Sequence, residues 1–215
     1  MNTRRVSGAG LVVALAMLVV MSVGAVSLVR AVSTGRMMAA NLAFRQAAVL
    51  ASDAGNEAAI DWLKPQLATA AVYADQPEQG YYASVPEGLD ATGNGSVSPA
   101  STSGQRVTID WDDDQCSGSA GTTCVAASPA LAADAAGNVI RYTIHRLCRS
   151  AGSPHSSANS CLVAGGGPGA SNKRSTLSYG ASSRFSVSAG IYYRITVRVR
   201  GPRNTTVFTQ TLLHF

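Results

Sequence analysis

The feature that most constrains this chain is an uncharged apolar run near its N-terminus, SGAGLVVALAMLVVMSVGAVSLVRAV at residues 7–32. No charged residue lies between Arg5 and Arg30. A helix rises about 1.5 Å per residue, so the 24 residues between these arginines would extend for about 36 Å, enough to cross the hydrocarbon core of a bilayer. The run therefore predicts a membrane-spanning helix.

Three uses of this apolar run are open from its residues alone. A cleaved secretion signal usually has an apolar region of about 7–15 residues that ends in a small-x-small cleavage site. Here the apolar region continues into SLVRAV without a clear site of that kind, which disfavours a cleaved signal. The other two interpretations are a permanent membrane anchor and an anchor that serves only until the protein is assembled.

The helix is expected to continue well beyond the membrane. From Arg30 to Leu63 the chain has no proline and many alanines, so Pro65 is the first residue that should stop the helix. We expect residues 9–32 to lie in the membrane and residues 33–64 to form an amphipathic second half. Small and apolar residues at intervals of three and four predict its packing face: Ala40, Phe44, Ala47, Leu50, Ala51, Ala54, Ala58 and Trp62.

Residues 65–215 change to the alternating pattern that is typical of strands. The clearest segments are QRVTIDW at 105–111, NVIRYTIHRLC at 138–148 and GIYYRITVRVRG at 190–201. The tetrapeptide GPRN at 201–204 then predicts a turn, and TTVFTQTLLHF predicts a returning strand. These segments indicate a small antiparallel sheet in a head domain over residues 65–215.

The two faces of the strand at 190–201 differ in polarity. One face carries Tyr193, Ile195, Val197 and Val199, and the other carries Arg194, Thr196, Arg198 and Arg200. An antiparallel sheet commonly buries one face and exposes the other to water. We therefore expect the apolar face to pack on the helix and the arginine face to be solvated, in an α+β fold.

The four cysteines all lie in the distal part of the chain, at Cys116, Cys124, Cys148 and Cys161. Four cysteines allow three disulfide connectivities. Their spacing does not match a zinc ribbon, and two local pairs, Cys116–Cys124 and Cys148–Cys161, are the favoured connectivity. Each disulfide would staple a short loop and place the head outside the cytoplasm. Four free thiols in a reducing compartment remain the alternative.

The arrangement as a whole resembles that of type IV pilins. It has a basic leader ending in glycine, an apolar helix that continues as an alanine-rich half, and a disulfide-bearing antiparallel sheet. The stretches GAGLVVALAMLVVMSVGAVS, RMMAANLAFRQAAVLASDAGNEAAIDWL and YYRITVRVRGPRNTTVFTQTLL resemble the PilX family of minor pilins and pilus-assembly proteins. The resemblance covers about residues 1–64 and 190–215.

This resemblance implies a maturation step at the start of the apolar run. In the family, a prepilin peptidase cuts after the glycine that closes the leader and methylates the new N-terminus. The GAGLVV match places that glycine at Gly8, so that residues 1–8 are the leader and Ala9 is the first mature residue. Gly10 is the competing position.

The resemblance also implies a location and a set of partners. The protein is expected in the bacterial inner membrane as a single-pass protein with a periplasmic head, and then in the assembled pilus. Its partners would be other minor pilins, the major pilin, the inner-membrane assembly machinery and, before assembly, membrane lipid. A pseudopilin of a type II secretion system and a bitopic envelope protein with a partner-binding head are the alternatives.

One residue departs from the usual pilin pattern. Pilins carry a glutamate at the fifth mature position, whereas that position here is Val13, or Leu15 with the later start, and the first acidic residue is Asp53. In a filament the glutamate neutralises the charged N-terminus of the neighbouring subunit, because a buried ammonium without a partner is costly. The absence of this carboxylate predicts a place at the pilus tip or in a priming complex.

The sequence offers little catalytic or metal-binding chemistry. Asp110, Asp112 and Asp114 alternate and form a weak calcium candidate, but the glycine and glutamate of an EF-hand loop are missing, so a solvated turn is favoured. His145 is expected to be a sheet side chain. With no nucleophile elbow or paired catalytic carboxylates, we expect neither an enzyme nor a cofactor. The formal net charge of +5 is scattered along the chain, which disfavours nucleic-acid binding.

Overall fold

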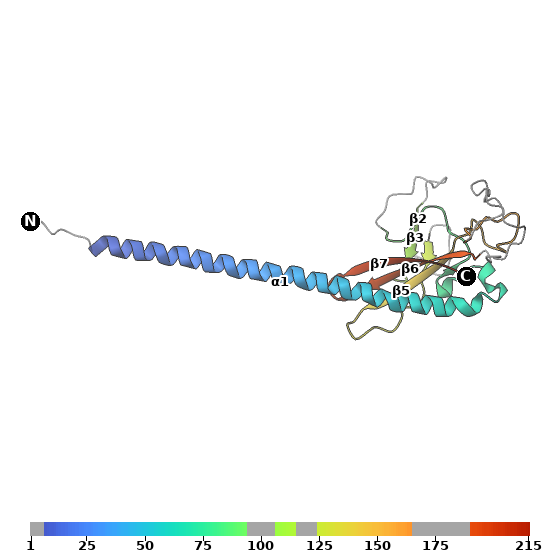
Figure 1. Cartoon of the computed structure of the whole chain (residues 1–215), viewed down its shortest axis with the longest axis horizontal. Coiled ribbons are helices and arrows are strands. Elements are labelled where there is room, and N and C mark those ends of the chain that lie inside the picture. Colours follow the sequence, from blue (N-terminus) through green and yellow to red (C-terminus); the bar gives the residue numbers. More distant parts are fainter. Residues whose placement is uncertain (1–6, 94–105, 115–123, 165–189) are drawn as a thin grey trace, which may run out of the picture. The chain divides into compact units, whose positions relative to one another are not determined.

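A computed structural model describes residues 7–93, 106–114, 124–164 and 190–215 (Figure 1). The chain divides into two compact units, Met1–Gln46 and Ala47–Phe215. We call these the N-terminal unit and the C-terminal unit, and describe each by itself.

The predicted long helix is present as α1, Ser7–Gln66. Its first 40 residues belong to the N-terminal unit and its last 20 to the C-terminal unit. Pro65 lies inside its last turn, so the helix ends one residue after the proline rather than before it. A proline this close to the C-terminus removes one backbone hydrogen bond but has no further turn to disrupt.

The C-terminal unit is built on a four-stranded sheet in the order β1-β5-β6-β7. The three long strands are β5 (Val139–Arg146), β6 (Tyr192–Arg200) and β7 (Thr206–His214). They pair antiparallel, as the alternating pattern predicted. The short strand β1 (Tyr81–Tyr82) pairs parallel with β5, so the sheet is mixed rather than purely antiparallel.

A second sheet was not expected from the sequence. It has three short strands in the order β2-β3-β4, all parallel: β2 (Leu89–Asp90), β3 (Val107–Asp110) and β4 (Cys124–Ala126). Only β3 was anticipated, because strands of two or three residues are too short to show an alternating pattern.

Three short 3-10 helices connect these elements. They are η1 (Ala70–Tyr73), η2 (Pro77–Gln79) and η3 (Pro202–Asn204). The last occupies the predicted turn between β6 and β7, where Arg203 and Asn204 adopt positive φ angles. The turn therefore forms where GPRN predicted it.

The last part of α1 packs on one face of the four-stranded sheet. The face that is buried is centred on Ala48, Ser52, Gly55, Ala59 and Leu63. Our predicted stripe was wrong by about one residue of rotation, since Ala47, Leu50 and Ala54 are exposed and Ala51, Ala58 and Trp62 only flank the contact.

Gly55 explains why this face is the one that packs. A Cβ atom at this position would lie 2.5 Å from Val197 Cγ1 and 2.8 Å from Ile140 Cγ2. Both atoms are side-chain atoms of the sheet's helix-facing side, where Val197 is fully buried. The helix can approach β5 and β6 this closely only because the residue at the crossing has no side chain.

The other face of the four-stranded sheet is also covered. A second apolar cluster lies there: Val107, Ile109, Trp111, Val125 and Ala127 come from β3, β4 and the residues that follow them, Tyr82 comes from β1, and Phe208 of β7 packs against them. Thr196 is 1% exposed and Arg198 is 9% exposed. The expectation of a solvated arginine face was therefore wrong at these positions, because β3 and its neighbours lie over them.

Candidate functional site

The first candidate site is the apolar half of α1. Its large apolar side chains are all exposed within the N-terminal unit, from Leu11 at 68% to Val32 at 47%. In the part of the chain that the structure describes, one helix is long and apolar enough to cross a membrane. No residue of its most apolar 18-residue segment is buried. This surface requires a partner that the N-terminal unit itself does not supply.

The few polar side chains in this half are satisfied within the helix. Ser22 Oγ donates a hydrogen bond to the carbonyl of Leu18 at 2.7 Å, and Ser27 Oγ donates to the carbonyl of Val23 at 2.8 Å. Hydroxyls that bond back to the preceding turn leave no unpaired donor at the helix surface. The helix can therefore enter lipid without leaving these groups unsatisfied.

The predicted processing residues lie at the start of this helix. Gly8 and Ala9 fall in the first turn of α1. Val13, at the position of the missing glutamate, is 54% exposed. A side chain at this position is therefore accessible from outside the N-terminal unit.

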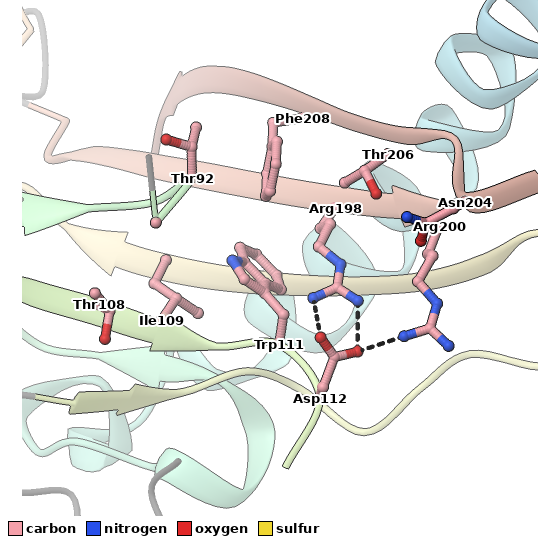
Figure 2. A pocket seen from close by; sticks show the side chains of 11 residues that line it. Thr92, Thr108, Ile109, Trp111, Asp112, Arg198, Arg200, Asn204, Thr206 and Phe208 are labelled. Carbon is pink, nitrogen blue, oxygen red and sulfur yellow. Dashed lines mark hydrogen bonds and ion pairs between the residues drawn. The ribbon is translucent and has the colours of Figure 1, made fainter. Parts of the chain in front are cut away.

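The second candidate site is a group of ion pairs between the two sheets of the C-terminal unit (Figure 2). Arg198 of β6 donates two hydrogen bonds to Asp112, at 2.8 and 2.6 Å, and Arg200 donates one at 2.9 Å. The guanidinium of Arg198 also lies 5.9 Å from the ring centroid of Trp111. Chiefly through its hydrogen bonds from Arg198, Asp112 has a pKa below its usual value.

A third arginine extends the group. Arg141 of β5 donates a hydrogen bond to Asp113 at 2.6 Å, and this bond raises the pKa of the arginine. Because Arg141 and Arg198 are cross-strand partners, the two like charges lie side by side on one face of the sheet. Asp112 and Asp113 compensate them, so the segment after β3 is held against the arginines.

The weak calcium hypothesis for the aspartates is not supported by this geometry. Asp110 is 3% exposed and its Oδ1 accepts hydrogen bonds from the backbone N–H groups of Asp112 and Asp114. Asp112 faces the arginines. In the described part of the chain no group of three acidic, histidine or cysteine residues is placed to hold a metal ion. The favoured solvated turn is present, since Asp112, Asp113 and Asp114 are exposed directly after β3, and two of its carboxylates also form ion pairs.

A cleft of about 660 Å³ lies beside the ion pairs (Figure 2). Its described lining comes from the end of β2, from β3 and Trp111, and from β6, η3 and β7: Thr92, Gly93, Thr108, Ile109, Trp111, Asp112, Arg198, Arg200, Asn204, Thr206 and Phe208. These residues offer no activated nucleophile and no free acid–base pair, since the carboxylate of Asp112 is engaged by arginines. The cleft is a candidate binding site.

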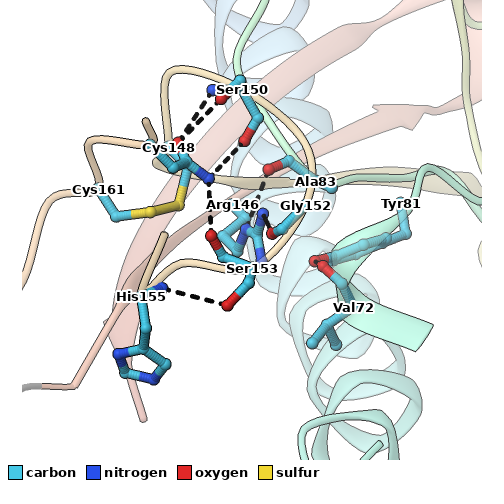
Figure 3. Close-up of a disulfide and its surroundings, with 11 residues drawn as sticks. Val72, Tyr81, Ala83, Arg146, Cys148, Ser150, Gly152, Ser153, His155 and Cys161 are labelled. Carbon is cyan, nitrogen blue, oxygen red and sulfur yellow. Dashed lines mark hydrogen bonds between the residues drawn. A yellow bond between two sulfur atoms is a disulfide. The ribbon is translucent and has the colours of Figure 1, made fainter. Parts of the chain in front are cut away.

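The Cys148–Cys161 disulfide predicted from the sequence is present (Figure 3). Cys116, of the other predicted pair, lies outside the described residues, so the Cys116–Cys124 pairing stays a prediction. The disulfide closes a surface loop in which the side chain of Asn159 accepts from Ser150 N and donates to Ser150 O. The loop is therefore held by its own hydrogen bonds as well as by the covalent bond.

Arg146 anchors this loop to the interior and was not singled out from the sequence. Its side chain is fully buried on the helix-facing side of β5, with Nε donating to the Ala83 carbonyl at 2.9 Å and Nη2 to the Gly152 carbonyl at 2.7 Å (Figure 3). It also lies 5.8 Å from the ring centroid of Tyr73. The sequence signal that could have identified Arg146 is the presence of an arginine on the apolar face of an alternating strand.

His145 is confirmed as a sheet side chain and is fully buried between the sheets. Its ring stacks on Tyr82 with centroids 5.3 Å apart, and neither ring nitrogen has a hydrogen-bond partner among the described residues. Burial, and secondarily the charge of Arg194, lowers the pKa of His145 to about 3. The His145 ring is therefore uncharged near neutral pH and packs as an apolar side chain. Its protonation on acidification lowers the stability of the folded state.

No protein-family model matches this chain, and comparisons with curated proteins and with solved structures found no significant match. The functional interpretation therefore rests on the residues and the geometry of this chain.

Proposed function

We propose that this protein is a minor pilin that acts in type IV pilus assembly, in a tip or priming complex with other minor pilins. The observation that carries the proposal is the contrast within α1. Its first half exposes every large apolar side chain, whereas its last turns are part of the core of a folded unit. One helix thus provides both a membrane-spanning segment and a structural element of the C-terminal unit.

The apolar half of α1 suits two successive environments. The same side chains that are compatible with lipid can pack against the helices of other subunits once the protein leaves the bilayer. Cleavage after Gly8 by a prepilin peptidase would remove the basic leader and make Ala9 the N-terminus. The inner membrane with a periplasmic C-terminal unit, and then the pilus, are the proposed locations.

The lack of an acidic residue near the start of α1 supports a place at the tip. A subunit without this carboxylate cannot neutralise the charged N-terminus of a neighbour, so it is a poor repeating subunit. We expect Val13→Glu to move a labelled protein from the tip into the pilus shaft. Val12→Glu is the matched control, because it adds the same charge one residue away, and it should leave the protein at the tip.

The location of the Val13→Glu protein decides this part of the proposal. Electron microscopy of immunolabelled pili would show label along the shaft if the account is correct. Label that stays only at the tip in the Val13→Glu protein would contradict the role given to the missing carboxylate, even if the protein is a pilin.

Deletion of the gene tests the assembly role itself. We expect a deletion strain to lose surface pili and twitching while the major pilin remains in the membrane, and expression of the wild-type chain to restore both. Normal piliation in the deletion strain would refute the assembly role and favour a bitopic envelope protein. Normal piliation with loss of protein secretion would favour a secretion pseudopilin.

A further inference from the structure

The strand β7 leaves one edge of the four-stranded sheet without a neighbour in the part of the chain that the structure describes. At the two ends of its ladder, Thr205 O accepts from Gly201 N, and Phe215 exchanges both backbone hydrogen bonds with Ile191. Hydrogen-bonded residues alternate in an antiparallel pair. The N–H and C=O groups that face away from β6 are therefore those of Thr206, Phe208, Gln210, Leu212 and His214.

The strand β7 itself carries none of the sequence features that usually protect an edge strand. It is nine residues long with an uninterrupted one-to-one register, and the segment 205–215 contains no lysine, arginine, acidic residue or proline. Leu212 is 61% exposed. Natural sheets normally block such an edge with charge, proline or a bulge, because it can pair with another chain. An unblocked edge is thus consistent with a strand-binding site.

The cleft lies along the first part of this edge (Figure 2). Thr206 and Phe208, two of the outward-bonding residues, contribute side chains to its lining. Arg200, the cross-strand partner of Thr206, lines the cleft and its side chain is 53% exposed. Arg200 donates one hydrogen bond to Asp112, and its other N–H groups have no acceptor among the described residues.

We propose that β7 receives an extended strand of a partner protein, which adds to the sheet and places alternate side chains against the cleft. In this mode the main-chain hydrogen bonds provide affinity and the flanking pockets provide specificity. The partner strand carries an acidic side chain opposite Thr206, where Arg200 can reach it, and apolar side chains opposite Phe208 and Leu212.

Charge favours a different protein over a second copy of this chain. Antiparallel pairing of two β7 strands about Gln210 would put His214 of one copy opposite Thr206 of the other, beside Arg200. The segment 205–215 has no acidic residue to offer this arginine. The partner is therefore defined by a carboxylate that β7 itself lacks. This proposal stands whether or not the protein is a pilin.

Site-specific photocrosslinking in native membranes tests the proposal on the full chain. A photoreactive phenylalanine analogue replaces Leu212, and the control places it at Leu162, which is 55% exposed but lies outside β7. We expect the probe at position 212 to crosslink to one short segment of one other protein, with a carboxylate and alternating apolar residues, and the probe at position 162 not to.

Two variants show whether the crosslink depends on strand addition. Gln210→Pro removes an outward N–H and the side-chain hydrogen bond from Gln210 Nε2 to Thr196 Oγ1, but no backbone hydrogen bond to β6. Compared with Gln210→Ala, which also lacks that side-chain bond, thermal unfolding should change little while the crosslink falls about tenfold. Arg200→Glu reverses the proposed charge and should cause a similar loss. Crosslinks to lipid or to many unrelated segments, crosslinks to β7 of a second copy, or an unchanged yield in either variant would each overturn the proposal.

Discussion

The two units of this molecule differ in whether the chain supplies partners for its own side chains. In the N-terminal unit, the apolar half of α1 exposes all its large apolar side chains. In the C-terminal unit, the last turns of the same helix pack closely on a sheet, with Gly55 at the crossing. Even arginine side chains are buried there, with hydrogen-bond partners. One continuous helix therefore has two kinds of apolar surface. The last turns pack within their own unit, whereas the apolar half contacts no other part of its own unit.

The largest expected effect comes from filling the helix–sheet crossing. Gly55→Leu would force side-chain atoms into Val197 and Ile140, so we expect a loss of about 3 kcal/mol or more in the free energy of unfolding. Gly24→Leu is the matched control, because nothing lies within 4 Å of a Cβ at Gly24. Thermal unfolding in detergent measures both. Equal stability of the two variants would show that α1 does not pack as described.

A charged residue introduced into the apolar half of α1 distinguishes a lipid-exposed position from a water-exposed one. Val20 is 71% exposed and Leu50 is 72% exposed, so their surroundings within the chain are nearly the same. We expect Val20→Lys to disfavour membrane insertion by about 3 kcal/mol, whereas Leu50→Lys should not change it. Membrane fractionation of cells measures the difference. Full membrane retention of both proteins would contradict a span centred near Val20.

The ion pairs allow a similar test inside the C-terminal unit. The side chain of Arg198 is 10% exposed, whereas that of Arg200 is 53% exposed, and both bind Asp112. We expect Arg198→Ala to cost about 2 kcal/mol, because it removes two charged hydrogen bonds and the contact with Trp111. Arg200→Ala should cost about 0.5 kcal/mol, as exposed ion pairs do. Chemical denaturation should rank them in this order, and the reverse ranking would be inconsistent with the burial.

Acid should act on the C-terminal unit through His145. Its folded-state pKa of about 3 is below its ordinary value of 6.5, so the unfolded chain takes up the proton first as the pH falls. Stability from the neutral form is complete above pH 6.5 and is lost progressively toward pH 3, by an amount on the order of 1–2 kcal/mol at pH 5.

His145→Phe isolates this contribution, because it keeps a ring against Tyr82 and removes the titration. We expect a flatter pH dependence of stability between pH 6.5 and 4 than in the wild type. His155→Phe is the control, since His155 is exposed. If His145→Phe and the wild type lose stability in parallel with acidification, the histidine is not buried in its neutral form.

The long periodic elements were predictable from the sequence. The apolar run and Pro65 located α1 within two residues at each end, and the alternation of β5, β6 and β7 identified the main sheet. Residue spacing also found the Cys148–Cys161 disulfide.

The short parallel strands were not predictable, and their absence from the prediction caused the error about the arginine face. Without the β2-β3-β4 sheet there is nothing to cover Arg198 or to bring Asp112 to it, so an alternating strand implied a solvated face and the acidic run gave no sign of its ion pairs. The cleft depends on the same pairing of distant segments, whereas the edge position of β7 depends on the strand order of the four-stranded sheet. Such contacts arise from tertiary packing, which local periodicity does not report.

We propose that α1 is a pilin helix rather than a permanent anchor or the remnant of a secretion signal. Mass spectrometry of the mature N-terminus, on protein purified from its native membrane, tests this claim most directly. We expect a chain that begins at a methylated Ala9. An intact Met1, or a chain that begins near or beyond Ser27, would contradict it.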